Sequence, residues 1–223
     1  MENFLLRLSA KICVLILLIN INASVATAAP KSFKQLLSLL VVKPESSNTK
    51  YDRDKHFGNW RDEDRDCLDT RAEVLVRDSL ISPIIKKCLV VSGRWYSFFD
   101  GRTHLLATEV QIDHLVALSE AWDSGASLWS KERRFNYAND LGYLGSLSAM
   151  TTKLNGNCKK LCKSDKDPAK WLPPKSQCVY AQRWVAVKYQ WGLSVDLAEK
   201  QVLSSLLSGQ CGEVSANVGR LGG

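Results

Sequence analysis

Apolar residues recur at helical spacing in several stretches of the chain. Residues 32–42 place apolar side chains three or four positions apart, which predicts an amphipathic stretch, either a propeptide or a first helix packed on the core. Asp69 is a good N-cap, and the helix that it predicts runs to Asp78 with Val74 and Leu75 facing inward. Further helical structure is predicted from residue 119, at residues 128–139, at residues 179–189 and after Ser194.

Three shorter segments have the pattern of strands. Residues 88–96 predict a strand, with a turn at Asp100 and Gly101, and residues 108–116 predict a second one. Residues 144–150 form a short apolar segment of the same kind. The chain has no internal repeats, and its length suits one domain that can bury a sizeable core. Together these elements predict an α+β domain.

The first 28 residues have a different character. Arg7 and Lys11 supply positive charge beside an apolar run at residues 12–21, which is too short to span a bilayer. Small residues at 26–28 are typical of a signal cleavage site. We therefore expect a secretory signal peptide, a secreted extracellular protein and no membrane contact after cleavage. A retained membrane anchor is the alternative.

The cysteines agree with export. The chain has seven, and Cys13 would leave with the signal peptide. An even number in an exported protein predicts disulfides. Proximity along the chain favours Cys67–Cys88, Cys158–Cys162 and Cys178–Cys211. A zinc site at Cys158 and Cys162 is the alternative, although no histidine lies near them in the sequence.

The charge of the chain suits a polyanionic partner. The formal net charge is +7, and loss of Glu2, Arg7 and Lys11 with the signal peptide lowers it to +6. A basic secreted protein can bind nucleic acid by counterion release. Glycosaminoglycans and acidic membranes fit the same charge, so charge alone does not choose between them.

Asp113 and His114 stand together near the end of the strand predicted at residues 108–116. An imidazole can remove a proton from water near neutral pH, and a carboxylate is a hard ligand for a divalent cation. Asn155 offers a second, neutral oxygen further along the chain. Adjacent strand residues point to opposite faces, so the pair can share one site only if the strand ends or bends there.

Several motifs accompany these residues. Residues 66–75 have the sequence D-C-L-D-T-R-A-E-V-L, and residues 113–126 have D-H-L-V-A-L-S-E-A-W-D-S-G-A. Further motifs lie at residues 51–60, 137–140, 165–168, 171–174 and 191–196. In this order the segments resemble the HNH endonucleases of the ββα-metal fold, and most closely their secreted branch. The resemblance runs from Tyr51 to Cys211 and includes motifs that carry no chemistry, which indicates a shared fold.

The resemblance implies an α+β domain with a ββα-metal core, surrounding helices and stabilising disulfides. It implies endonucleolytic hydrolysis of nucleic acid with low sequence specificity, DNA rather than RNA, leaving 5′-phosphates. His114 would be the general base, and Asp113 and Asn155 would hold one Mg²⁺ or Mn²⁺ ion. Extra residues follow Asn155 compared with the family, so the alignment could slide to Asn157. The segment leading into Asn155 has the family spacing and favours Asn155.

Other polar residues have two interpretations each. Arg71 could grip a phosphate and Glu73 could orient it, or the two could form an internal pair. Arg133 and Arg134 could follow the phosphate backbone, or simply solvate a helix face. The tryptophans are expected in the core rather than as stacking platforms for bases; they are Trp60, Trp95, Trp122, Trp171, Trp184 and Trp191.

We divide the chain into a signal peptide at 1–28, an N-terminal segment and linker at 29–50, a nuclease domain at 51–211 and a flexible tail at 212–223. We expect a monomer. Two other functions remain open. One is a catalytically silent, basic secreted protein that binds DNA or an acidic polysaccharide. The other is a secreted phosphodiesterase for small substrates.

Overall fold

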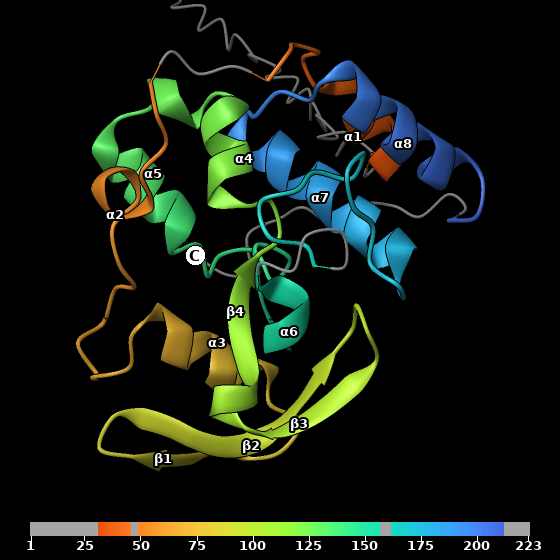
Figure 1. The fold of residues 1–223 in the computed structure, drawn as a ribbon. Coiled ribbons are helices and arrows are strands. Elements are labelled where there is room, and N and C mark those ends of the chain that lie inside the picture. Colours follow the sequence, from red (N-terminus) through yellow and green to blue (C-terminus); the bar gives the residue numbers. More distant parts are fainter. Residues whose placement is uncertain (1–30, 46–48, 157–161, 212–223) are drawn as a thin grey trace, which may run out of the picture.

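The computed structural model describes residues 31–45, 49–156 and 162–211. Helices gather at one end of the molecule and a three-stranded sheet lies at the other, with strand β4 (Val110–His114) between them (Figure 1). The mixed α and β architecture that we predicted is confirmed. None of the described helices is long and apolar enough to cross a membrane. The predicted signal peptide and tail lie outside the described residues.

The helical end is built around one central helix. Its elements are α1 (Phe33–Leu39), α4 (Leu118–Asp123), α5 (Lys131–Ala138), α7 (Gln177–Trp191) and α8 (Leu197–Ser208). Their buried side chains form the larger core, with Tyr180 and Trp184 of α7 fully buried. α1 contacts α7 and α8, and a parallel bridge between Val42 and Val195 extends that contact.

Local capping explains where the predicted helices begin. Asp69 caps α3 (Thr70–Asp78) as predicted, and its side chain accepts a hydrogen bond from the backbone of Ala72. The helix predicted at residues 128–139 is divided. A 3₁₀ turn, η2 (Ala126–Leu128), comes first, and Ser130 then caps α5.

The last helix begins later than we predicted. Asp196, not Ser194, is its N-cap, because Asp196 forms a reciprocal capping box with Glu199. Ser194 instead donates its hydroxyl proton to the carbonyl of Ser124. A short helix that we did not predict, α2 (Arg53–His56), is capped by Asp52.

The outer sheet is antiparallel and has the order β1 (Ile84–Lys86), β2 (Leu89–Ser97), β3 (Arg102–Leu106). Only β2 was predicted, because β1 and β3 expose most of their side chains and lack a buried alternating pattern. Trp95 of β2 is fully buried and donates its indole proton to the carbonyl of Leu75 in α3. The smaller core therefore lies between this sheet, α3, the turn η1 (Ala107–Glu109) and the strands β4 and β5 (Leu147–Thr151).

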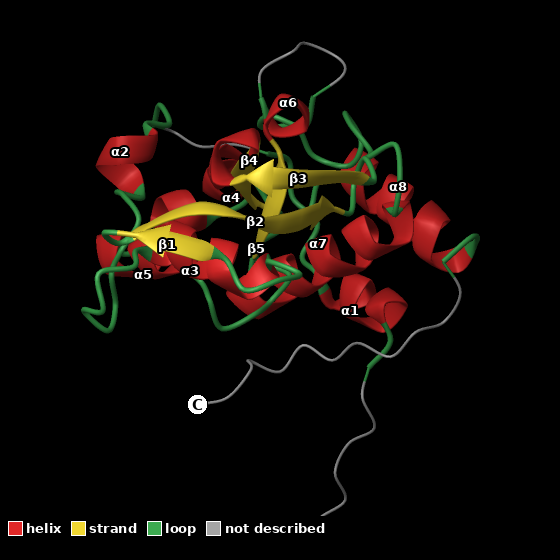
Figure 2. Ribbon diagram, turned by 90° about the horizontal axis from the view of Figure 1, so that it is seen from below, coloured by secondary structure: helices red, strands yellow, loops and turns green. Residues whose placement is uncertain are grey.

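β4 forms a separate antiparallel pair with β5 (Leu147–Thr151), in which His114 lies opposite Leu147. The short helix α6 (Thr152–Asn155) follows β5 directly and contacts both strands, close to β4 in Figure 2. Asn155 is thus the last residue of a helix.

Disulfides join segments that lie apart in the sequence. Within the described residues, Cys67–Cys88 and Cys178–Cys211 have both partners present, and both pairs were predicted. Cys162 is disulfide-bonded as well, which argues against a zinc site at this residue. Cys158, its predicted partner, lies outside the described residues.

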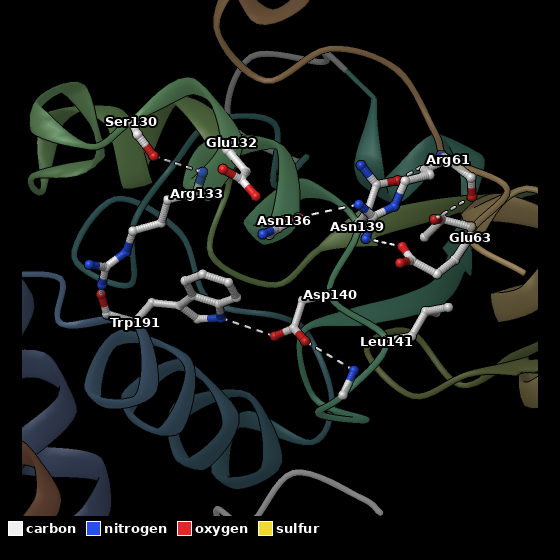
Figure 3. Close-up of a pocket in the computed structure, with 12 residues that line it drawn as sticks. Arg61, Glu63, Ser130, Glu132, Arg133, Asn136, Asn139, Asp140, Leu141 and Trp191 are labelled. Atoms are coloured by element: carbon white, nitrogen blue, oxygen red, sulfur yellow. Dashed lines mark hydrogen bonds and ion pairs between the residues drawn. The ribbon is translucent and has the colours of Figure 1, made fainter. Parts of the chain in front are cut away.

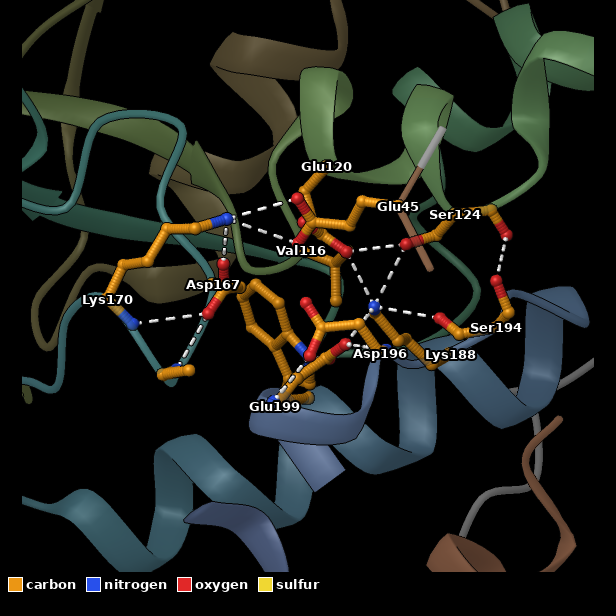
Figure 4. Close-up of polar contacts among 12 residues, drawn as sticks. Glu45, Val116, Glu120, Ser124, Asp167, Lys170, Lys188, Ser194, Asp196 and Glu199 are labelled. Carbon is orange, nitrogen blue, oxygen red and sulfur yellow. Dashed lines mark hydrogen bonds and ion pairs between the residues drawn. The ribbon is translucent and has the colours of Figure 1, made fainter. Parts of the chain in front are cut away.

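Lys188 is a buried cation shared by three elements of the helical end (Figure 4). Its ammonium donates to Glu120 of α4 at 2.6 Å, to Glu199 of α8 at 2.8 Å and to the carbonyl of Ser194 at 2.9 Å. One ammonium thus faces two buried carboxylates. Burial raises the pKa of Glu199 to about 7, and Glu120 adds to the rise although Lys188 and Trp184 oppose it.

We predict that this cluster makes the fold less stable as pH rises from about 4.5 to about 7. In that window the folded protein holds a proton on Glu199 that the unfolded chain has released, so the free energy of unfolding falls with pH. Glu199→Gln keeps acceptor and donor groups but does not titrate. The free energy of unfolding of this variant, measured with denaturant at several pH values, should therefore fall less with pH, by on the order of 2 kcal/mol across the window. Exposed Glu132→Gln is the control. An unchanged slope in Glu199→Gln would contradict the prediction.

Candidate active site

Asp113 and His114 are the last two residues of β4, and the chain turns away immediately after them. The backbone of Leu115 donates to the carbonyl of Ser146, and α4 then leads into the helical end. Asp113 is 4% exposed and His114 is 8% exposed. Both line one pocket of about 270 Å³. β4 therefore ends directly after Asp113 and His114. This is the condition that had to be met for the two adjacent side chains to share a site.

One ring nitrogen of His114 is held by the backbone. Nε2 lies 2.9 Å from the carbonyl oxygen of Ala138. A carbonyl only accepts, so Nε2 carries the proton and Nδ1 keeps its lone pair. Burial lowers the pKa of His114 to about 3, and nearby Arg53 and Lys163 contribute to the decrease. The imidazole is therefore neutral at neutral pH, as a proton acceptor must be.

The ring of His114 also stacks on an indole. The centroid of Trp60 lies 5.2 Å from that of His114, and the two planes are 6° apart. The guanidinium of Arg53 lies 5.8 Å from the Trp60 ring on the exposed edge of the site. Trp60 is only partly buried, unlike Trp95 or Trp184. Our expectation that Trp60 is a core residue is therefore only partly met.

The two carboxylate oxygens of Asp113 have different surroundings. Oδ1 accepts a hydrogen bond from the ammonium of Lys163 at 2.7 Å. Oδ2 is buried and has no hydrogen-bond partner among the described residues. Burial raises the pKa of Asp113, while Lys163 acts in the opposite direction. A buried oxygen without a donor is unfavourable unless something else binds it.

Asn155 reaches the same pocket from α6. It lies at the C-terminal end of that helix, is half-buried, and lines the pocket together with Asp113 and His114. The structure thus brings together the residues that we predicted as the catalytic set. Asn157, the alternative ligand, lies outside the described residues.

The residues of this pocket fit a hard divalent cation. Asp113 Oδ2 lacks a partner, Asn155 supplies an amide oxygen, and Asp165 contributes a further carboxylate to the pocket wall. Oxygen ligands of this type suit Mg²⁺ or Mn²⁺ better than Zn²⁺.

The chain matches the family model described as "GmrSD restriction endonucleases, C-terminal domain" over residues 71–206. It belongs to this family. The family is of the HNH type, so the resemblance drawn from the sequence motifs is confirmed. A relative from Arthroderma benhamiae, named "Uncharacterized secreted protein", is 40% identical over 177 residues, which cover 78% of this chain and 83% of the relative. No solved structure matches the chain.

The match includes Asp113, His114, Asn155 and Lys163 but not Arg53 or Trp60, which precede it. The neighbours of His114 on the exposed side of the site are therefore supplied by a segment outside the matched region.

Three arginines that we considered for phosphate binding are hydrogen-bonded to backbone carbonyls. Arg71 donates to Ala107 and Val110, and so joins α3 to the start of β4. Arg133 donates to the carbonyl of Trp191 and lies over the Trp129 ring. Arg134 donates to the carbonyls of His56 at the end of α2, of Ala126 in η2 and of Trp129.

Glu73 does not pair with Arg71 in the described contacts. Burial raises the pKa of Glu73, and Asp66, Asp64 and Asp62 add to the rise. The internal Arg71–Glu73 pair that we considered is therefore not among the described contacts. Arg71 bonds the backbone instead.

A second pocket, of about 700 Å³, is larger but carries less chemistry (Figure 3). Asp140 in its wall accepts from Trp191, Ser146 and the backbone of Gly142. The arginines in its wall stand beside Glu63 and Glu132. Because its main polar groups are satisfied internally and its charges are mixed, we keep the smaller pocket as the candidate active site.

Sequence analysis missed Lys163, Asp165 and Arg53 as site residues. Asp165 belongs to the D-x-D-P motif and Arg53 to the Y-x-R motif, so both had a sequence signal. Lys163 opens the stretch that leads into the same D-x-D-P motif, but nothing in the sequence linked it to Asp113, which lies 50 residues away.

Proposed function

We propose that this protein is a secreted, metal-dependent HNH-type endonuclease that hydrolyses phosphodiester bonds of nucleic acid with low sequence specificity. The observation that carries the proposal is the pairing, in one pocket, of a neutral His114 whose Nε2 is engaged by a carbonyl with an Asp113 oxygen that lacks a partner. Membership of a restriction endonuclease family supports it.

The elements around the pocket support a ββα-metal core. β4 and β5 form an antiparallel pair, and α6 follows at once. In this proposal the strand pair supplies Asp113 and His114, and the short helix supplies Asn155. The disulfides and the helical end would hold this small unit in place.

His114 acts as the general base. Its Nδ1 accepts the proton of a water molecule as that water attacks phosphorus, and the carbonyl of Ala138 steadies the ring through Nε2. Trp60 restricts ring rotation by stacking. Asp113 and Asn155 would hold one Mg²⁺ or Mn²⁺ ion, which when bound stabilises charge on the phosphoryl and leaving oxygens.

Arg53 is the best candidate for a phosphate contact. It is exposed at the pocket wall, and its guanidinium makes no hydrogen bond or ion pair within the part of the chain that the structure describes. Stacking over Trp60 leaves its N–H groups free to bind a phosphate. Arg71, Arg133 and Arg134 would then have mainly structural roles, because backbone carbonyls already engage them.

We also propose DNA rather than RNA as the main substrate, since His–metal chemistry does not use the 2′-hydroxyl. Secretion is supported by the name of the Arthroderma benhamiae relative, "Uncharacterized secreted protein", and by the predicted signal peptide at 1–28. Residues 51–211 would supply the catalytic residues of a monomeric nuclease, with α1 packed against the helical end. The second candidate function is that of a catalytically silent protein that binds polyanions. The net charge of +7 favours it.

His114→Ala should lower the rate of DNA cleavage by about 10²–10⁴-fold, because removal of a general base costs that much. Nicking of supercoiled plasmid with Mg²⁺ measures the rate, and a chelator should abolish it. His104→Gln is the matched control, because His104 lies on β3 and its ring bonds Thr151 instead.

Near wild-type cleavage by folded His114→Ala would refute the mechanism. No cleavage by wild-type protein with Mg²⁺ or Mn²⁺, together with retained DNA binding, would favour the silent binding protein. Rapid hydrolysis of small phosphodiesters without plasmid nicking would favour the small-substrate phosphodiesterase.

Asn155→Ala should raise the Mg²⁺ concentration that gives half-maximal activity, because an oxygen ligand is lost. Calorimetric titration of Mg²⁺ into Asn155→Ala and Asn157→Ala distinguishes the two alignments. Weakened affinity in Asn157→Ala with unchanged affinity in Asn155→Ala would move the ligand to Asn157.

Arg53→Ala should weaken binding to unrelated duplexes alike and reduce the slope of log affinity against log salt by about one unit. Binding is measured in chelator to prevent cleavage. Arg133→Ala combined with Arg134→Ala should change this slope little, because carbonyls engage both guanidinium groups. A decrease of about two units in the double variant alone would instead support the phosphate role predicted for that pair from the sequence.

A further inference from the structure

Lys163 is a fully buried lysine that links the two segments on which the proposed catalytic residues lie. Its ammonium donates to Asp113 Oδ1 and to the carbonyl of His114, each at 2.7 Å. Its backbone N–H donates to the carbonyl of Leu154 at 2.9 Å, directly before Asn155. One residue thus contacts the end of β4 through its side chain and the end of α6 through its backbone.

A buried ammonium is unfavourable unless it is paired and hydrogen-bonded. Lys163 satisfies this condition with one carboxylate, whereas Lys188 faces two. The Lys163–Asp113 pair is therefore neutral as a unit. The pair lies beside the pocket rather than within either hydrophobic core. A purely structural ion pair would not need that location.

The contact with Asp113 selects one of its oxygens. Lys163 holds Oδ1, whereas Oδ2 has no hydrogen-bond partner among the described residues and is the oxygen that stands ready for another ligand. A carboxylate held in this way cannot rotate to exchange its two oxygens without losing the bond to Lys163.

The contact with His114 acts on a different group from the contact made by Ala138. Lys163 holds the backbone carbonyl of His114, while the carbonyl of Ala138 holds its Nε2. The backbone and the ring of His114 are thus fixed separately. Loss of either contact would let Nδ1 move relative to Asp113, and displacements of about 1 Å can cost about 10²-fold in rate.

We propose that Lys163 is the positioning residue of this site: it orients Asp113 and His114 together and ties both to the helix that carries Asn155. It touches neither substrate nor the attacking water. This inference rests on the proposed nuclease function and adds to it a residue that acts through the catalytic set.

Lys163→Met tests the proposal, because methionine keeps much of the volume and removes the donors. We expect kcat for plasmid cleavage to fall by about 10²-fold, with KM for DNA changed only a few-fold. A second readout does not need activity: Mg²⁺ should raise the melting temperature of wild-type protein through binding to the folded state. That rise should be largely lost in Lys163→Met.

Lys188→Met is the matched control, since Lys188 is equally buried but serves only the helical end. It should lower the melting temperature, while kcat of the folded protein and the Mg²⁺-dependent rise stay close to wild type. If Lys163→Met behaves like Lys188→Met, with reduced stability but normal kcat and normal response to Mg²⁺, the proposal is overturned.

Lys163→Met could fail to fold, so a measurement on folded protein complements it. Buried lysine ammonium groups give protected ¹H–¹⁵N signals, and Lys188→Met identifies which signal belongs to Lys163. Saturating Mg²⁺ should shift the Lys163 signal in wild-type protein. A signal that does not move at saturation overturns the proposal even without the methionine variant.

Failure of the nuclease proposal would look different. In that case wild-type protein would neither cleave nucleic acid nor respond to Mg²⁺. Wild-type cleavage that depends on His114 but not on Lys163 would reject only the positioning role.

Discussion

The antiparallel pairing of β4 with β5 is the constraint on which the candidate site depends. It places His114 opposite Leu147 at the last position of the strand, so the chain can leave the sheet directly after the Asp113–His114 pair. It also delivers the chain from β5 straight into α6 and so brings Asn155 back beside β4. A one-residue slip of either strand would turn the side chains of that strand to the other face and separate these residues.

Features that depend on neighbouring residues could be predicted from the sequence. Asp69 caps α3 because its side chain reaches a backbone N–H three residues later, and such contacts are visible as motifs. The Asp113–His114 pair and Asn155 were found in the same way, with the order of several motifs indicating the family. The disulfides at Cys67 and Cys178 were also accessible from chain proximity.

Features that depend on distant contacts could not be predicted. Lys163 looks like any solvated lysine until the fold brings it to Asp113. Arg133 and Arg134 look like an exposed basic pair, yet carbonyls from other segments engage them. Strand β3 has no buried alternation of its own, so only its pairing with β2 reveals it. In each case tertiary structure, not local preference, decides the outcome.

The packing of α1 has a practical consequence for how the protein can be divided. Leu36, Leu37 and Leu40 belong to the larger core, and the backbones of Val41 and Lys43 bond with Val195 beyond them. A fragment starting at residue 51 would keep every proposed catalytic residue but leave an apolar hollow over α7 and α8. Proteolytic removal of this segment would therefore damage the scaffold rather than uncover a finished enzyme, so we do not regard it as a disposable propeptide.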